Sequence, residues 1–201
     1  MIKNTIKIAL VGQPNVGKSM LINSISNARL KVGNFSGVTV SKEQVFFDYK
    51  NFHIEIVDLP GAYSLNDYTI EEKVTKDFLN NEKYDIILNV LDSTNLQRNL
   101  LLTAELLTLD KKMIIALNMS DEAEKESILI DEIQLSKILG KPCIKTSAAK
   151  KNGITKLLDE ILLKFQSQKV PSKFFFSNVI EEEIENISRV LEENKYETTE
   201  T

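Results

Sequence analysis

Two kinds of hydrophobic pattern alternate along the chain. Short runs rich in β-branched and other apolar residues are typical of buried strands, and segments with apolar residues at helical spacing are typical of helices. The runs predict six strands, at Ile6–Val11, Lys42–Asp48, Phe52–Asp58, Asp85–Leu91, Met113–Asn118 and Cys143–Thr146. The helical spacing predicts five helices, at Lys18–Ser26, Glu71–Leu79, Leu96–Leu109, Asp131–Leu139 and Ile154–Gln166.

The order of these segments indicates the fold class. Strands that alternate with helices form a parallel sheet with helices on both faces. The exception is the turn Asp48-Tyr49-Lys50-Asn51, because a connection of that length joins antiparallel neighbours. The sequence therefore predicts an α/β protein with a six-stranded, mostly parallel sheet that contains one antiparallel strand.

A change in composition divides the chain near Gln168. The segment Gln168-Lys169-Val170-Pro171-Ser172 is typical of a linker, because Pro171 cannot continue a helix and Ser172 can cap the next one. We expect residues 1–168 to form one domain, and residues 169–201 to form a linker and one amphipathic helix. The apolar stripe of that helix needs the first domain or more chain to cover it.

Composition and charge narrow the class of protein. The 201 residues are 42% hydrophobic and 27% charged, which is typical of a globular protein with a sizeable core. The net charge of −4 argues against non-specific binding to nucleic acid or anionic lipid. The acidity lies in residues 173–201, which carry eight acidic and three basic residues. No apolar run approaches the length of a membrane span, and the single cysteine, Cys143, favours a reducing compartment.

The segment after the first predicted strand matches the pattern G-x-x-x-x-G-K-[ST] of a phosphate-binding loop, or P-loop. Its glycines allow backbone N–H groups to surround phosphate oxygens, and the following helix adds its positive N-terminus. We expect Lys18 to reach the β- and γ-phosphates and the Ser19 hydroxyl to bind Mg²⁺. The candidate cofactor-binding residues here are Gly12, Gln13, Pro14, Asn15, Val16, Gly17, Lys18, Ser19 and Met20.

Two further segments can respond to a γ-phosphate. Asp58-Leu59-Pro60-Gly61 ends the third predicted strand, where the carboxylate can hold Mg²⁺ through water and the Gly61 N–H can contact the γ-phosphate. Thr39 lies before the second predicted strand and can bring its hydroxyl to Mg²⁺ and its backbone to the γ-phosphate. Without a phosphate, the first segment is an ordinary strand end and Thr39 a β-branched residue that begins a strand.

The segment Asn118-Met119-Ser120-Asp121 indicates which base is bound. A carboxylate only accepts hydrogen bonds, so Asp121 matches the adjacent N–H and NH₂ donors of guanine and leaves the edge of adenine unsatisfied. After the next predicted strand, small residues can supply backbone N–H groups for the guanine carbonyl. The candidate base-binding residues are Asn118, Met119, Asp121, Ser147, Ala148 and Ala149. The sequence therefore predicts a GTP/GDP site and a GTPase that switches between two states.

Five segments carry a more specific resemblance: Gly12–Ser19, Val32–Val40, Asp58–Leu65, Leu91–Leu100 and Asn118–Asp121. Together they resemble the N-terminal GTPase domain of FeoB, the bacterial ferrous iron transporter, over Ile6 to Gln166. The resemblance implies a Ras-like P-loop GTPase fold and a regulatory role at the cytoplasmic face of the bacterial inner membrane. It also implies that residues 169–201 begin a truncated helical domain. The implied partner is the membrane-spanning part of the transporter, which is absent from this soluble fragment and through which a homo-oligomer could form.

The residue after Gly61 departs from the Ras-like pattern. Ras-like enzymes carry a glutamine there that orients the attacking water, whereas this chain has Ala62. FeoB resembles GTPases activated by K⁺, whose P-loop asparagine corresponds to Asn15. The resemblance implies that Asn15 and the carbonyls of Asn34 and Phe35 hold a K⁺ ion; alternatively, Asn15 stiffens the loop through its own backbone hydrogen bonds. The candidate catalytic residues are Asn15, Lys18, Thr39 and Gly61.

Two other functions remain open at this point. Ala62 is compatible with a nucleotide switch that hydrolyses GTP very little. A GTPase of ribosome assembly or tRNA modification is the other alternative, although such proteins usually append a basic RNA-binding module and this tail is acidic. We therefore expect no nucleic acid partner.

Overall fold

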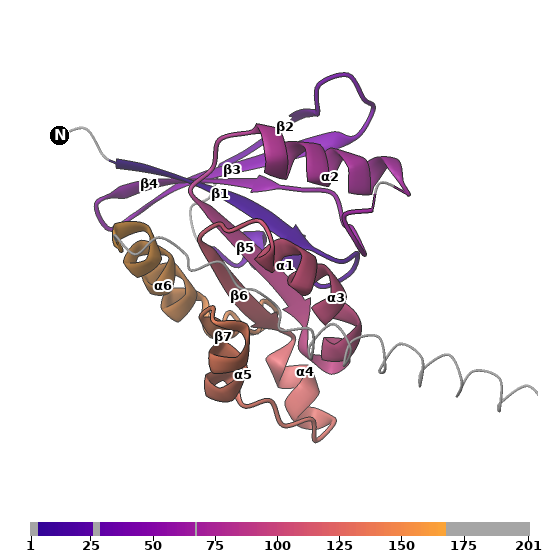
Figure 1. Ribbon diagram of the computed structural model, residues 1–201. Coiled ribbons are helices and arrows are strands. Elements are labelled where there is room, and N and C mark those ends of the chain that lie inside the picture. The colour runs from indigo at the N-terminus through magenta and orange to yellow at the C-terminus, as the bar shows by residue number, and fades with distance from the viewer. Residues whose placement is uncertain (1–3, 26–28, 67, 168–201) are drawn as a thin grey trace, which may run out of the picture.

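A single twisted sheet of seven strands runs through the computed structural model, which describes residues 4–25, 29–66 and 68–167 (Figure 1). The predicted linker and helix at 169–201 lie outside the described residues. In chain order the strands are β1 (Asn4–Gly12), β2 (Arg29–Asn34), β3 (Ser41–Tyr49), β4 (Phe52–Asp58), β5 (Ile86–Asp92), β6 (Met113–Asn118) and β7 (Cys143–Lys145).

The order across the sheet is β2-β3-β4-β1-β5-β6-β7. Strand β1 pairs in parallel with β4 and β5, and the parallel pairing continues through β6 to β7. Strand β3 is antiparallel to both of its neighbours, β2 and β4, so it is the one strand of the sheet that runs the opposite way. The prediction of a mostly parallel sheet with one antiparallel strand is therefore confirmed.

The predicted number of six strands is wrong, because β2 adds a seventh at the edge of the sheet. Every residue of β2 is exposed, including Leu30 at 59% and Val32 at 60%. A strand without a buried face lacks the hydrophobic pattern that identifies the others. The alternation of Arg29, Leu30, Lys31 and Val32 is the one local signal, and pairing with β3 determines the outcome.

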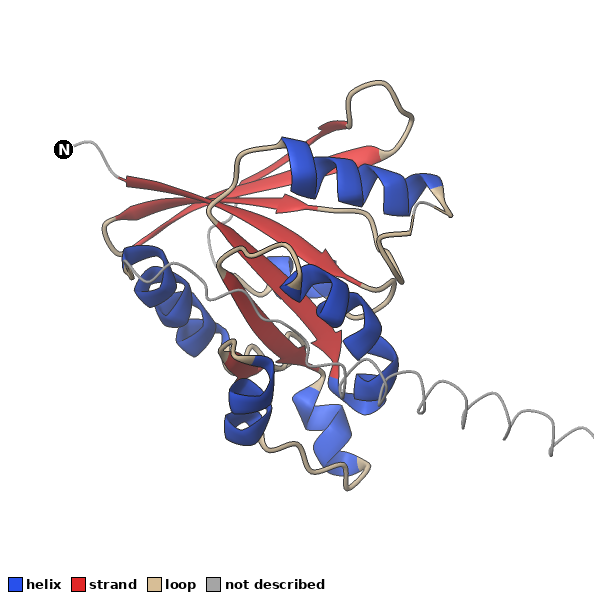
Figure 2. Cartoon of the chain, in the orientation of Figure 1, coloured by secondary structure: helices blue, strands red, loops and turns tan. Residues whose placement is uncertain are grey.

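Helices cover both faces of the sheet, as Figure 2 shows. They are α1 (Lys18–Asn23), α2 (Ile70–Asn81), α3 (Leu96–Leu107), α4 (Ser120–Lys125), α5 (Glu132–Leu139) and α6 (Ile154–Gln166), with a 3-10 turn η1 at Ser93–Asn95. Helix α1 is shorter than predicted, and the six-residue α4 was not predicted because its sequence SDEAEK has no apolar periodicity. Among the described residues, no helix has the length and apolar character needed to cross a membrane.

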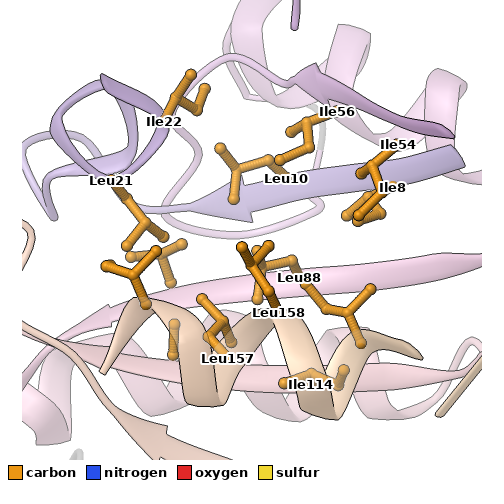
Figure 3. Close-up of a cluster of buried hydrophobic side chains, with 14 of the residues drawn as sticks. Ile8, Leu10, Leu21, Ile22, Ile54, Ile56, Leu88, Ile114, Leu157 and Leu158 are labelled. Atoms are coloured by element: carbon orange, nitrogen blue, oxygen red, sulfur yellow. The ribbon is translucent and has the colours of Figure 1, made fainter. Parts of the chain in front are cut away.

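Two hydrophobic clusters form the core, one on each face of the sheet. Helices α1 and α6 pack on one face, where Leu21, Leu157 and Leu158 point toward the side chains of β1 and β5 (Figure 3). Helices α2 and α3 pack on the other, with Phe78 and Leu102. Strand β1 is buried on both faces, so successive residues within it belong to opposite clusters. The loops that follow β1, β4, β6 and β7 emerge on the same side of the sheet, at the carboxyl ends of the strands, because these strands are parallel.

Candidate functional site

The loop between β1 and α1 has a backbone that requires glycine at two positions. Gly17 has φ of 86°, a left-handed conformation that side chains other than glycine rarely adopt, and a Cβ there would lie 2.5 Å from Asn118 Nδ2. A Cβ on Gly12 would lie 2.6 Å from the carbonyl oxygen of Val90. Asn15 is also left-handed, with φ of 68°. These conformations curl the loop around the N-terminus of α1, a geometry that suits phosphate.

The ammonium of Lys18 and the carboxylate of Asp58 face each other beside this loop, with Nζ and Oδ1 3.9 Å apart. Burial lowers the pKa of Lys18, and Asp58 opposes this change. Burial raises the pKa of Asp58 to about 6; Lys18 lowers it in part, and Glu43, its register partner on β3, raises it further. The two charges form an ion pair but no hydrogen bond, so each of them can still bind a further charged group.

One oxygen of the Asp58 carboxylate lacks a hydrogen bond. Its Oδ1 is buried and has no hydrogen-bond partner among the described residues. A buried carboxylate oxygen without a hydrogen bond is costly, and oxygen atoms are the ligands that Mg²⁺ prefers. Ser19, in the first turn of α1, is exposed and can contribute a hydroxyl. The chemistry of these groups fits a magnesium ion bound between α1 and β4.

The loop after β4 lies against the P-loop. The backbone N–H of Ala62 donates to the carbonyl of Gly12 at 3.2 Å. A Cβ on Gly61 would lie 3.0 Å from Pro14, so glycine permits this close approach. Among the hydrogen bonds of the described residues, none uses the N–H of Gly61. This N–H can therefore donate to a phosphate.

Two carboxylates that the sequence analysis missed hold the continuation of this loop. Buried Glu72 of α2 accepts a hydrogen bond from the Ser64 N–H at 3.2 Å, and Glu105 of α3 accepts one from the Leu65 N–H at 2.7 Å. Burial raises the pKa of Glu105. Their sequence positions carry no motif; only a buried acidic residue on an apolar helix face would have indicated them.

Asn118 connects three loops. Its side chain is 1% exposed, and its Nδ2 donates to the carbonyl of Val16 in the P-loop at 2.9 Å. Its Oδ1 accepts from the Ala148 N–H at 3.1 Å and from the Thr146 hydroxyl at 3.3 Å. The structure thus brings together the predicted phosphate and base segments, which lie 102 positions apart at Val16 and Asn118.

Asp121 lies beside the same loops in the first turn of α4. Its side chain is 13% exposed and forms an ion pair with Lys150, whose Nζ lies 3.3 Å from Oδ2. A hydrogen bond from the Ser147 side chain, together with Lys150, lowers the pKa of Asp121, so the carboxylate is ionised at neutral pH. Met119 precedes it with φ of 57°. Ala149 is exposed in the loop after β7, and the Asp121 carboxylate can receive two hydrogen bonds from the edge of a base.

The segment between β2 and β3 is not joined to the other site residues. Phe35 is buried against α2, with its ring 6.1 Å from that of Phe78 and nearly perpendicular to it. Together with α2 it lines an apolar groove of about 370 Å³. Asn34 and Thr39 are exposed, and neither side chain hydrogen-bonds to a described residue. Among the described residues, no hydrogen bond joins the Thr39 side chain to Ser19 or Asp58.

Three features define the class of this protein. They are a mostly parallel sheet of this strand order, a P-loop after its first strand, and a buried asparagine that joins the P-loop to the loop after β7. They are the features of a Ras-like P-loop G domain.

Comparison with known proteins identifies the family. The model of the family Ferrous iron transport protein B matches residues 6–161, and the chain belongs to this family, FeoB. The alternative family assignment, a GTPase of ribosome assembly or tRNA modification, is therefore wrong.

The curated relatives are transporters of greater length. The chain is 53% identical over 176 residues to the Fe(2+) transporter FeoB of Campylobacter jejuni, which covers 88% of this chain and 29% of that protein. It is 58% identical over 180 residues to the Fe(2+) transporter FeoB of Helicobacter pylori, covering 85% of this chain and 28% of that protein. The chain thus spans less than a third of the length of these relatives.

Solved structures agree with the fold. The G domain of the T. maritima FeoB iron transporter superposes with a TM-score of 0.76 at 39% identity, covering 81% of this chain and all of that one. The cytosolic domain of the same transporter in a GDP form gives a TM-score of 0.83 at 36% identity, covering 94% of this chain and 75% of that one. A third structure holds that cytosolic domain in a GMPPNP form, with a TM-score of 0.81 at 36% identity over 93% of this chain and 74% of that one.

Proposed function

We propose that this chain binds GTP and hydrolyses it to GDP and phosphate. The observation that carries the proposal is the buried Asn118, because it assembles the P-loop and the loop after β7 into one site. Membership of the FeoB family and the GDP and GMPPNP forms of the T. maritima relative support a guanine nucleotide as the ligand.

The base and the phosphates bind to different residues. Asp121 accepts hydrogen bonds from guanine, with Met119 and the loop residues Ser147, Ala148 and Ala149 around the ring. The backbone of the P-loop surrounds the phosphates, Met20 continues this loop into α1, and Lys18 neutralises charge on the β- and γ-phosphates. The Gly61 N–H, free of other described partners, donates to the γ-phosphate.

Ser19, Asp58 and Thr39 are the proposed magnesium ligands. The buried Oδ1 of Asp58, which has no hydrogen-bond partner, supports this assignment for a site of oxygen ligands. Bound there, Mg²⁺ supplies positive charge against the phosphate oxygens. Thr39 lies in the connection between β2 and β3, and its exposed side chain has no hydrogen bond to a described residue. In this proposal its hydroxyl moves to the magnesium ion when GTP binds. The segment 34–39 would then report the presence of the γ-phosphate.

Asn15 is the proposed ligand of a potassium ion, with the carbonyls of Asn34 and Phe35. Its exposed side chain makes no hydrogen bond to the described residues, so it does not stiffen the P-loop in this structure and is available to a cation. Bound beside the phosphates, K⁺ supplies the charge that an arginine finger supplies elsewhere.

Steady-state GTP turnover in KCl and in NaCl of equal ionic strength tests these assignments. We expect faster turnover in KCl, and no difference between the salts for Asn15→Ala. Equal rates for the unchanged protein would contradict the potassium site. A flat single-turnover time course in KCl, with GTP bound, would contradict hydrolysis and favour the switch with little activity.

Within a full-length transporter, the chain would serve as the regulatory G domain at the cytoplasmic face of the bacterial inner membrane. In this proposal, residues 1–168 form this domain and residues 169–201 begin a helical domain that leads toward the membrane-spanning part. The membrane-spanning part is the proposed partner, and a homo-oligomer would form through it. The family and the relatives named as Fe(2+) transporters support this role. Restoration of ferrous iron uptake by the full-length protein, and its loss with Lys18→Ala, tests it.

A further inference from the structure

The loop that follows Gly61 is in contact with an arginine of α3. The guanidinium carbon of Arg98 lies 4.8 Å from the centre of the Tyr63 ring, within the range of a cation–π interaction. Tyr63 directly follows Ala62, which stands where a Ras-like enzyme has its glutamine. Both side chains are exposed, and Tyr63 is 44% exposed, so the pair lies on the surface of the loop and not in the core.

The same arginine is joined to the P-loop through its backbone. The Gln13 side chain is 4% exposed, and its Nε2 donates to the carbonyl oxygen of Arg98 at 2.7 Å. The Ala62 N–H donates to Gly12, the residue before Gln13. The P-loop, the start of α3 and the loop after β4 therefore form a closed circuit of three contacts.

We propose that Arg98 is a positioning residue for GTP hydrolysis, acting through its contact with Tyr63. The inference rests on the proposed function. Ala62 has no side chain that could orient water, so the orientation has to come from the backbone of Gly61 and Ala62. The ring of Tyr63, in contact with Arg98, restricts this backbone, while Gln13 joins the backbone of Arg98 to the P-loop. A loop that is held in place keeps the Gly61 N–H directed at the γ-phosphate during the reaction.

Kinetics of three variants of the pair test the inference. An exposed cation–π contact corresponds to about a two- to fivefold change in rate. We therefore expect Arg98→Met and Tyr63→Leu each to lower kcat by this factor, with KM and the affinity for GDP unchanged. The double variant should lose no more than either single variant, because both remove the same contact. Tyr63→Phe keeps the ring and should retain the kcat of the unchanged protein.

Tyr68→Leu is the matched control, since Tyr68 is 85% exposed and makes no ring contact among the described residues. Unchanged kcat in both single variants would overturn the inference, as would losses that multiply in the double variant. A lower unfolding midpoint or weaker GDP binding that accounts for the loss of kcat would also overturn it, because the pair would then be structural. Absence of turnover in the unchanged protein would overturn the proposed function itself, and this inference with it.

Discussion

The two ends of the candidate site are built differently. At the base end, Asn118 is buried and makes three hydrogen bonds to neighbouring loops, and Asp121 is paired with Lys150. At the γ-phosphate end, the side chains of Asn34 and Thr39 are exposed and form no hydrogen bond to a described residue. The base end is assembled by the protein alone, whereas the other end lacks contacts that a nucleotide would have to supply.

This difference has a physical reason. A buried amide that loses its partners costs free energy, so the network around Asn118 stays formed whether or not a ligand is present. A segment with few buried contacts can change conformation at little cost. A protein that recognises guanine in both nucleotide states but responds only to the γ-phosphate needs this distribution of order.

The largest effect is expected from Asn118→Ala. The substitution leaves the Val16 carbonyl and the Ala148 N–H unpaired, so we expect a loss of about 3 kcal/mol in the free energy of unfolding. Nucleotide affinity should fall at least about 100-fold, because the loops of the site separate. Urea unfolding and titration with fluorescent GDP measure both quantities.

Asn89→Ala is its control, since Asn89 is equally buried and bonds to Thr103 on the side of α3. It should cost stability without changing the affinity for GDP. Equal losses of affinity in both variants would show that Asn118 acts through general stability alone.

Asp58→Asn tests the buried charge that lies beside Lys18 of the P-loop. The pKa of Asp58 in the folded protein is about 6, above its ordinary value of 3.8, so the folded state binds more protons than the unfolded state between these values. The unfolding free energy of the protein without nucleotide and Mg²⁺ should therefore fall by about 3 kcal/mol as the pH rises through this window. Asp58→Asn should flatten this dependence, measured by denaturant unfolding at several pH values.

Asp159→Asn provides a comparison of opposite sign. Hydrogen bonds from Lys50 and Tyr49 lower the pKa of Asp159, so the unchanged carboxylate favours folding as the pH rises. If Asp58→Asn leaves the pH profile as it is, burial does not raise the pKa of Asp58.

Thr39→Ala should separate activity from stability. Its hydroxyl has no described partner, so the unfolding free energy should change by less than about 0.5 kcal/mol. We expect GTP turnover to fall about tenfold, because the side chain is needed only when GTP and Mg²⁺ are bound. Ser36→Ala, in the same connection, should leave turnover unchanged, and a matching loss there would point to the segment as a whole.

The smallest effect is expected from Lys150→Met. The side chain of Lys150 is 58% exposed, and an exposed ion pair contributes at most about 1 kcal/mol. The dissociation rate of GDP, followed by stopped-flow fluorescence, should change by less than about fivefold, and Lys151→Met should not change it. A much larger effect would mean that Lys150 orders the base end as strongly as Asn118 does.

Much of the fold could be predicted because its elements carry local patterns. Strand β4, strand β6 and helix α6 have the predicted bounds, since each buries a face that shows in the sequence. Strand β2 and helix α4 could not be predicted in this way, because neither has a regular apolar face. Their formation depends on neighbours in space, namely β3 for the first and η1 for the second.

The site divides along the same line. The P-loop and the segments at Asp58 and Asn118 are motifs in which spacing and chemistry are local, so they could be recognised. Glu72 and Glu105 are single acidic residues within helices, and nothing near them in sequence indicates that they hold the loop after β4.

The sequence alone determined the class of element at most positions, the phosphate-binding motif and the motif Asn118-Met119-Ser120-Asp121 that predicts a preference for guanine, because hydrophobic period, glycine and hydrogen-bonding groups act over a few residues. Only the tertiary structure decided that Asn118 bonds to Val16 and Ala148, that Asp58 Oδ1 is buried without a hydrogen bond, and that Arg98 contacts Tyr63. The physical reason is that burial and hydrogen-bond partners come from segments far apart in the chain, which the parallel strands bring to one edge of the sheet.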